Sequence, residues 1–120
     1  MRMLTRLSYL AFILLCGAHH AGSANFLHGS VACPGSGTAQ LASVSTKASF
    51  IVAQSPLLPT PNTGRIHFGG SGVTTSGGVY ILPGDSYSWP PEGNSAVFDL
   101  RQIYFACTVN TDIVTFDYVQ

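Results

Sequence analysis

The glycine-rich stretch at residues 67–86, HFGGSGVTTSGGVYILPGDS, is the first candidate for a ligand-binding loop. A phosphate-binding P-loop ends in a lysine, but the single lysine of the chain is Lys47, upstream of the stretch. A dinucleotide fingerprint needs a third glycine where Thr75 stands, and a nucleophile elbow needs one where Val73 stands. The stretch therefore predicts turns between strands, where glycine adopts backbone conformations that other residues resist.

The acidic residues offer no pair of the kind that a hydrolase uses as acid and base. Asp85, Glu92 and Asp99 stand in predicted turns or loops, where aspartate commonly bonds to nearby backbone. Asp112 is expected in a turn, and Asp117 at an outward strand position. We therefore expect solvated acids, and the chain is predicted to be no enzyme and to need no cofactor.

Histidine and cysteine give no metal site by their spacing. His28 and His67 are lone histidines, expected at the surface rather than as ligands. Cys33 and Cys107 are the only cysteines after residue 24, because Cys16 lies in the apolar N-terminal segment. An oxidising compartment would let this pair form a disulfide, and the alternative is two unrelated buried thiols.

Tyr87 and Trp89, followed by Pro90 and Pro91, form the one aromatic cluster that the sequence places in exposed surroundings. Such a cluster could contact a sugar or a protein, which makes Tyr87 and Trp89 a candidate binding surface. The alternative is a tryptophan that covers the end of a sandwich core.

The N-terminal 24 residues are predicted to be a secretory signal peptide, with Arg2 and Arg6 before an apolar run at residues 7–18. Small residues at Gly22 and Ala24 suit a cleavage site. A retained hydrophobic anchor is the alternative, whereas lipidation at Cys16 is disfavoured because the residue before it is a leucine. The remaining 96 residues suffice for one domain.

Charge excludes one class of partner. After residue 24 the chain carries three basic and five acidic residues, a net charge of −2. No basic patch is available to neutralise phosphates, so we do not expect binding to nucleic acid.

The elements that must position these residues are strands. No segment after residue 38 repeats apolar residues at helical spacing, and short β-rich runs alternate with Pro, Gly, Asn and Ser clusters. We predict a flexible arm at residues 25–38 and, at residues 39–120, an all-β antiparallel sandwich of about seven strands, jelly-roll-like or Ig-like. Residues 47–54 are apolar on both faces, which predicts a strand buried on both sides. Residues 109–112, VNTD, predict a hairpin between the last two strands.

Two segments, NTGRIHFGGSGVTTSGGVYILPGDSYSWP and SAVFDLRQIYFACTVNTDIVTFDYV, resemble small all-β virion proteins of tailed bacteriophages and prophages. The resemblance spans about residues 47–119 and implies a decoration, head-fibre or tail-associated subunit that oligomerises and binds other protein subunits. It carries no catalytic residues. The matching positions occupy turns and are architectural: Asn62, Gly64, Gly69, Gly70, Gly72, Gly77, Gly78, Pro83, Gly84 and Asp85.

Two features depart from that resemblance, since a virion protein assembled in the cytoplasm needs neither a secretion signal nor a disulfide. Either a cell exports the domain or the true start lies downstream, for example at an alternative codon at Val31. The prediction is therefore a virion protein. The alternative is a secreted, periplasmic or cell-surface module that recognises a glycan or receptor through Tyr87 and Trp89.

Overall fold

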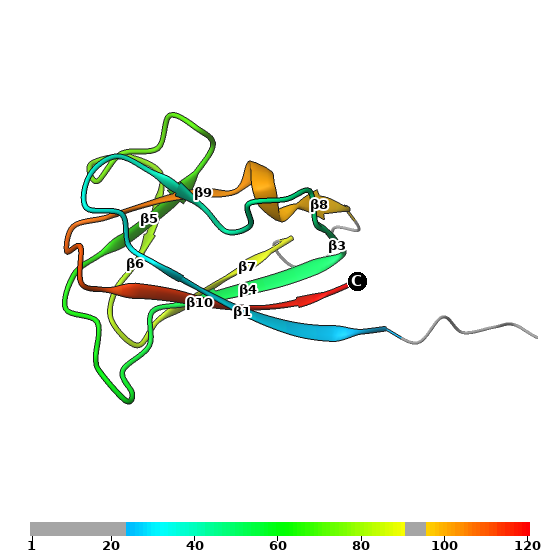
Figure 1. The fold of residues 1–120 in the computed structure, drawn as a ribbon, viewed down its shortest axis with the longest axis horizontal. Coiled ribbons are helices and arrows are strands. Elements are labelled where there is room, and N and C mark those ends of the chain that lie inside the picture. The colour runs from blue at the N-terminus through cyan, green and yellow to red at the C-terminus, as the bar shows by residue number, and fades with distance from the viewer. Residues whose placement is uncertain (1–23, 91–95) are drawn as a thin grey trace, which may run out of the picture.

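The structure, a computed structural model, describes residues 24–90 and 96–120. The predicted signal segment, apart from its last residue, lies outside the described residues, as does Glu92. Within them there are ten strands and one 3-10 helix (Figure 1). The elements are β1 (Phe26–Ala32), β2 (Ala39–Gln40), β3 (Lys47–Ala48), β4 (Phe50–Gln54), β5 (Ile66–Gly69), β6 (Val79–Ile81), β7 (Ser86–Trp89), β8 (Phe98–Asp99), η1 (Leu100–Gln102), β9 (Tyr104–Cys107) and β10 (Ile113–Val119).

The strands form two four-stranded antiparallel sheets and one short pair. Sheet A has the order β1-β10-β4-β7, sheet B has the order β2-β9-β5-β6, and β3 pairs with β8. Pairing is nested: the first strand pairs with the last, the second with the ninth, and so on inward to β5 and β6. The chain therefore forms one long antiparallel pair of arms that folds across both sheets, which is the jelly-roll topology. The predicted all-β sandwich is confirmed, in the first of its two expected forms.

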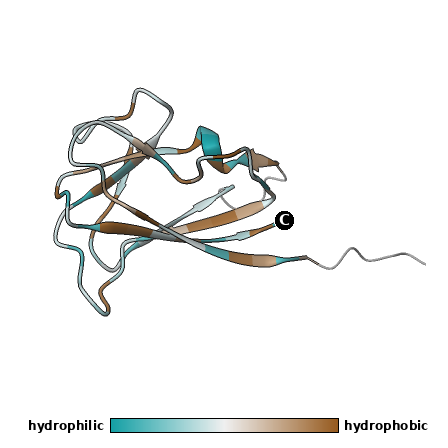
Figure 2. Cartoon of the chain, in the orientation of Figure 1, coloured by the Kyte–Doolittle hydropathy of each residue, from teal (hydrophilic) through white to brown (hydrophobic). Residues whose placement is uncertain are grey.

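The core lies between the two sheets, and strand alternation selects the side chains that enter it. In β10, Val114 and Phe116 are buried whereas Asp117 is exposed, as a period of two predicts. Figure 2 shows the hydrophobic residues gathered on the strands of both sheets. Each fully buried Ile or Phe stabilises the fold by about 1.5–3 kcal/mol relative to an exposed one. The largest fully buried side chains are those of Leu41, Ile51, Ile66, Phe68, Leu100, Phe105 and Val114.

Strand β4 is buried on one face only, so the prediction of burial on both faces was wrong. Ile51 and Ala53 are fully buried, whereas Phe50 is 43% exposed and Val52 is half-buried. An antiparallel sheet with one face packed on the core leaves the other face to solvent, even where the residues there are apolar.

The flexible arm predicted at residues 25–38 was wrong for half of its length, because residues 26–32 form strand β1. Seven consecutive residues pair with β10, from Phe26 opposite Val119 to Ala32 opposite Ile113. Gly29, one of three glycines in this range, has a packing role. A Cβ on Gly29 would collide with the ring of Phe116, which lies over it in the core.

The hairpin predicted at residues 109–112 does not form, since β9 belongs to sheet B and β10 to sheet A. The turn residues were recognised correctly, but they serve a crossing between sheets. In this nested arrangement consecutive strands lie in different sheets, except for β5 and β6, which pair with each other. Among the described residues, none lies in a helix long and apolar enough to cross a membrane.

Candidate contact site at the loop end of the sandwich

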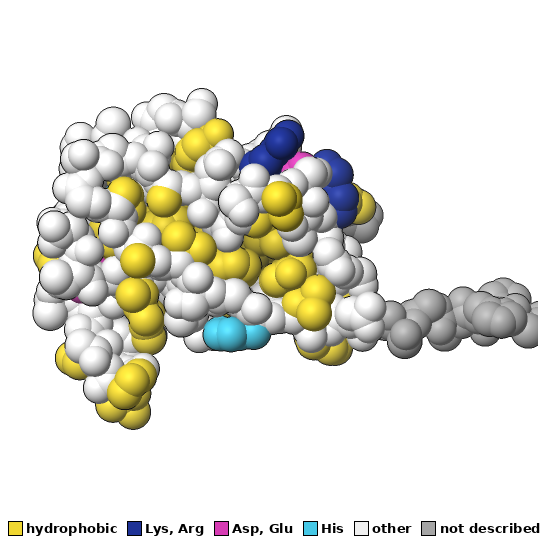
Figure 3. Space-filling model, in the orientation of Figure 1, with side chains coloured by type: hydrophobic (Ala, Val, Ile, Leu, Met, Phe, Trp, Pro, Cys, Tyr) yellow, Lys and Arg dark blue, Asp and Glu magenta, His cyan; other side chains and the backbone are white. Residues whose placement is uncertain are grey.

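Residues 55–64, which make up most of the connection between β4 and β5, project from one end of the sandwich, and we call them the leucine loop (lower left in Figure 1). Leu58 is 82% exposed and Leu57 is 52% exposed. Leu82, in the turn after β6, is 46% exposed. Figure 3 shows hydrophobic side chains at the tip of this projection. Exposed apolar residues that cluster in this way are typical of protein-contact surfaces.

The base of the leucine loop is fixed to the neighbouring turn by backbone hydrogen bonds. The Ser55 N–H donates to the Asp85 carbonyl at 3.0 Å, and the Gly84 N–H donates to the Ser55 carbonyl at 2.7 Å. Leu57 packs against Gly84, whose φ of +88° is in the left-handed region that favours glycine. The two segments enclose a groove of about 460 Å³, lined by Gln54, Ser55, Pro56, Leu57, Leu58, Gly84, Asp85 and Ser86.

The far end of the leucine loop is held by Asn62, which is 4% exposed. In the register of β10 with β4, the residue opposite Ile113 would be Pro56, whose nitrogen carries no hydrogen. The Asn62 side chain takes that place: its amide donates to the Ile113 carbonyl at 2.6 Å and its oxygen accepts from the Ile113 N–H at 2.9 Å. The same amide also donates to the Ser55 hydroxyl at 2.9 Å. The Asn62 side chain therefore continues the hydrogen bonding of sheet A beyond the end of β4.

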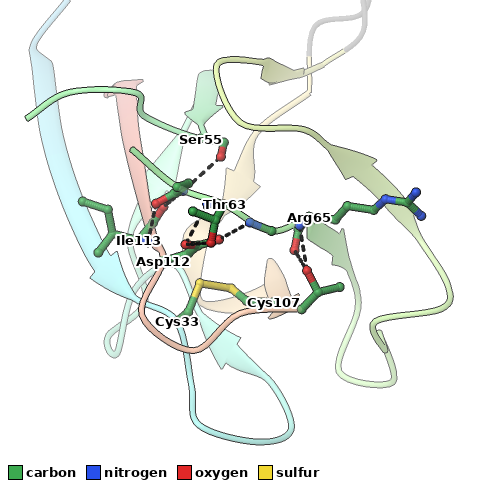
Figure 4. Close-up of a disulfide and its surroundings, with 10 residues drawn as sticks. Cys33, Ser55, Thr63, Arg65, Cys107, Asp112 and Ile113 are labelled. Carbon is green, nitrogen blue, oxygen red and sulfur yellow. Dashed lines mark hydrogen bonds between the residues drawn. A yellow bond between two sulfur atoms is a disulfide. The ribbon is translucent and has the colours of Figure 1, made fainter. Parts of the chain in front are cut away.

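Asp112 supplies the second clamp on the leucine loop (Figure 4). Its carboxylate accepts from the Thr63 N–H at 3.0 Å and from the Gly64 N–H at 2.7 Å. Asp112 is only 3% exposed, so the prediction of a solvated turn acid was wrong for this residue. A buried carboxylate is tolerated here because two backbone donors satisfy it.

Beside this clamp lies the predicted disulfide between Cys33 and Cys107, which is confirmed (Figure 4). It links the residue after β1 to the last residue of β9. At this corner the chain passes from β1 to β2 and from β9 to β10, each time between the two sheets. The Cys33 N–H also donates to the Asp112 carbonyl at 2.9 Å. With a sequence separation of 74 between the cysteines, the cross-link stabilises the fold by about 4 kcal/mol in the chain-entropy model.

Tyr87 and Trp89, the aromatic candidates, lie on the core side of β7. Both are half-buried and packed against the core, with their rings 4.7 Å apart between centroids. The Trp89 ring also meets the Phe68 ring edge-on at 5.3 Å. This position corresponds to the alternative of a tryptophan that covers the core.

Asp99, a second acid expected in solvent, is also buried and ends the short β3–β8 pair. The Ser45 hydroxyl donates to its carboxylate at 2.6 Å. Together with the backbone N–H groups of Arg101 and Thr46 and the ammonium of Lys47, this bond holds the pKa of Asp99 well below its ordinary value, although burial opposes the shift. The cluster fixes chain segments in place and presents no free acid. Asp85 and Asp117 are exposed, as expected.

His67 was expected at the surface but is only 4% exposed. It points to the outer side of sheet B, where the loop at residues 70–78 folds back and the Gly77 carbonyl accepts from the His67 Nδ1–H at 3.0 Å. Within the described chain its Nε2 is buried without a hydrogen-bond partner. His28, in contrast, is exposed as expected and lies 2.9 Å from Asp117.

The turn positions of the resemblance have different roles in the structure. Gly64 is close-packed, since a Cβ there would collide with Thr108, and Gly78 has a φ of +83°. Gly70 and Gly72 face open space, so nothing in their surroundings requires glycine. Pro83 and Gly84 form the turn between β6 and β7 that supports the leucine loop.

Sequence reasoning missed the leucine loop as a site, although it recognised residues 55–64 as a loop. The available signal was a pair of leucines between prolines, in a segment too rich in proline to enter a core strand. Across residues 24–90 and 96–120, no group of three or more His, Cys, Asp or Glu side chains could hold a metal ion. Comparison with protein-family models, with curated proteins and with solved structures found no match to this chain.

Proposed function

We propose that this chain is a non-enzymatic, phage-type virion structural subunit that acts by binding other protein subunits. The observation that carries the proposal is the leucine loop: two leucines, 52% and 82% exposed, on a segment clamped at both of its ends. Exposing apolar side chains costs solvation free energy, and a rigid loop loses little entropy when a partner covers it.

The jelly roll supports this proposal as an analogy, since capsid proteins and lectins both use it. Between these two, the placement of the aromatic residues favours protein contact. The rings expected to stack on a glycan, Tyr87 and Trp89, pack against the core instead. The exported glycan- or receptor-binding module remains the second candidate, and a Trp89→Ala variant would test core packing rather than a glycan site.

The test is to locate the protein by mass spectrometry in density-purified particles and in the free secreted fraction of the same culture. We expect enrichment in particles, and loss from particles for the double variant Leu57→Ser and Leu58→Ser. Thr60→Ala is the matched control, because Thr60 is exposed on the same loop and contributes no large apolar surface. Recovery in the free fraction alone would overturn the virion proposal and favour the exported module.

A further inference from the structure

Strand β1 is the outermost strand of sheet A and has the longest free edge among the strands that end a sheet. Asn25 and Gln120 exchange both of their backbone hydrogen bonds, at 3.4 and 3.1 Å. In an antiparallel ladder every second residue bonds to the partner strand, so Leu27, Gly29 and Val31 direct their backbone groups to β10.

The residues between them face the other way. Phe26, His28, Ser30 and Ala32 direct their N–H and C=O groups away from β10, outside the sheet. Each of these four residues therefore offers one backbone donor and one backbone acceptor along the free edge of β1. Such an edge is a template for another strand.

The other edges are protected in the ways that natural sheets use, and β1 is not. β2 has two residues and β6 has three, whereas β7 has four and runs directly into Pro90. Short strands and edge prolines both prevent pairing between molecules. β1 has seven residues, FLHGSVA, with no proline and no Asp, Glu, Lys or Arg.

We propose that β1 pairs with β1 of a second copy of this chain, antiparallel about a two-fold axis at Gly29. Phe26 then lies opposite Ala32 of the second copy, and His28 lies opposite Ser30. Every outward backbone group of one copy meets an outward group of the other, and two copies of sheet A become one continuous sheet. The contact is isologous and closes on itself, so it gives a dimer and no filament.

The side chains fit this register, which favours a second copy over a foreign strand. On the core side, Leu27, which is 38% exposed, lies opposite Val31 of the second copy, so apolar meets apolar. On the outer side, Phe26 is 80% exposed and gains Ala32 as its neighbour. His28 faces Ser30, so the two histidines do not oppose each other. The pairing does not depend on whether the other partners belong to a virion.

The test is the mass of the full protein by sedimentation from micromolar to millimolar concentration, with Ser30→Pro as the breaking variant. The Ser30 N–H points away from β10, so proline there removes a donor from the new interface and leaves the β1–β10 ladder intact. We expect a monomer–dimer equilibrium that Ser30→Pro weakens by at least about tenfold, since one bond per copy is lost. Ser30→Ala keeps its N–H and should dimerise like the parent.

A second measurement decides the question if Ser30→Pro fails to fold. Phe26→Cys together with Ala32→Cys should give a covalent dimer on mild oxidation, because each cysteine faces the other type in the second copy. Six residues separate them along one strand, about 20 Å, so they cannot bond within a copy. Ala32→Cys alone should form no covalent dimer under the same oxidation, because it faces Phe26 of the second copy.

A parent protein that stays monomeric at millimolar concentration would overturn the proposal, as would equal dimerisation by Ser30→Pro. If the protein is monomeric but the outward-facing β1 amides are protected from exchange, the chain's own residues before Asn25 cover the edge. That result would also overturn the proposal. Particle association is measured separately with the leucine-loop variants, so failure here leaves the proposed function standing.

Discussion

The two sheets of the sandwich differ in how they meet solvent. On the outer side of sheet B, His67 and Ala106 are buried, at 4% and 1% exposure, because the loop at residues 70–78 folds back there. Val73 of that loop is itself buried, at 9% exposure. On the outer side of sheet A, Phe50 is 43% exposed and Val52 is half-buried. The loop therefore covers the middle of sheet B, although Tyr80 of β6, on the same side, is 51% exposed. Over β4, the outer side of sheet A leaves Phe50 exposed.

The same difference holds for the edges, since sheet B ends in strands of two and three residues and sheet A ends in the seven residues of β1. The leucine loop belongs to neither sheet alone, because it leads from β4 of sheet A to β5 of sheet B. Exposed apolar side chains occur on both sheets, since Val79 and Tyr80 of sheet B are 43% and 51% exposed. The longest backbone edge left for hydrogen bonds to another molecule, however, belongs to sheet A. One long unprotected edge is the arrangement expected if sheet A pairs with a second copy at that edge.

The largest expected effect on stability comes from removing the disulfide at the corner between the two sheets. Replacing both Cys33 and Cys107 by serine should lower the free energy of unfolding by about 4 kcal/mol, because the unfolded chain regains the freedom of a long loop. Urea unfolding of the variant and the parent, both under oxidising conditions, measures the difference. A loss below about 1 kcal/mol would show that the clamps of Asn62 and Asp112 alone hold the corner.

Next in size is the loss of the side chain that extends sheet A. Asn62→Ala should lower the free energy of unfolding by about 2–4 kcal/mol, because the Ile113 N–H and C=O both lose their partner in a buried setting. Asn110→Ala is the matched control, since Asn110 is an exposed asparagine in the neighbouring turn. Equal unfolding midpoints for the two variants would contradict the role given to Asn62.

The packing of the loop at residues 70–78 on sheet B can be tested by substituting two of its glycines. Gly78→Ala should cost about 1–3 kcal/mol, because its φ is +83° and a Cβ there would collide with the Phe68 carbonyl. Gly70→Ala should change stability by less than about 1 kcal/mol, because a Cβ at Gly70 meets nothing. Thermal unfolding compares the pair, and a Gly70→Ala variant as unstable as Gly78→Ala would contradict the packing described.

The smallest expected effect is a change in the pH dependence of stability at the β3–β8 pair. The folded-state pKa of Asp99 lies below its unfolded value, so its contribution is present above about pH 4 and is lost as the pH falls through the folded pKa. Asp99→Asn should therefore be less stable than the parent at neutral pH and should lose less stability on acidification. Asp117→Asn, an exposed acid, is the control. Parallel curves for Asp99→Asn and the parent would refute the assignment.

Sequence reasoning predicted what depends on local pattern or on simple counting. Short β-rich runs between turn residues predicted strands, and two cysteines after the N-terminal segment predicted a disulfide. It failed where a distant partner decides the outcome. Asp99 and Asp112 have the composition of turn acids, but they are buried because backbone donors about 50 residues away in the chain converge on them. Nothing local distinguishes such an acid from a solvated one.

The same reason explains the errors in topology. VNTD was recognised as a turn, but whether the strands on either side of it pair or diverge depends on the nested pairing of the whole chain. Residues 26–32 have weak strand character alone and become a strand because β10 offers a full-length partner. The sequence of two leucines between prolines does not show whether their side chains will be exposed or buried in the core. The leucine loop was therefore not predicted as a site.

The most direct test of the free edge of sheet A is amide hydrogen exchange along β1, followed by NMR at low and high protein concentration. The amides of Leu27, Gly29 and Val31 bond to β10 and should be protected at both concentrations. The amides of His28, Ser30 and Ala32 should exchange fast in dilute solution and become protected as concentration rises. If these three exchange fast at every concentration, the β1 edge does not join another copy and the account of sheet A as the joining side is contradicted.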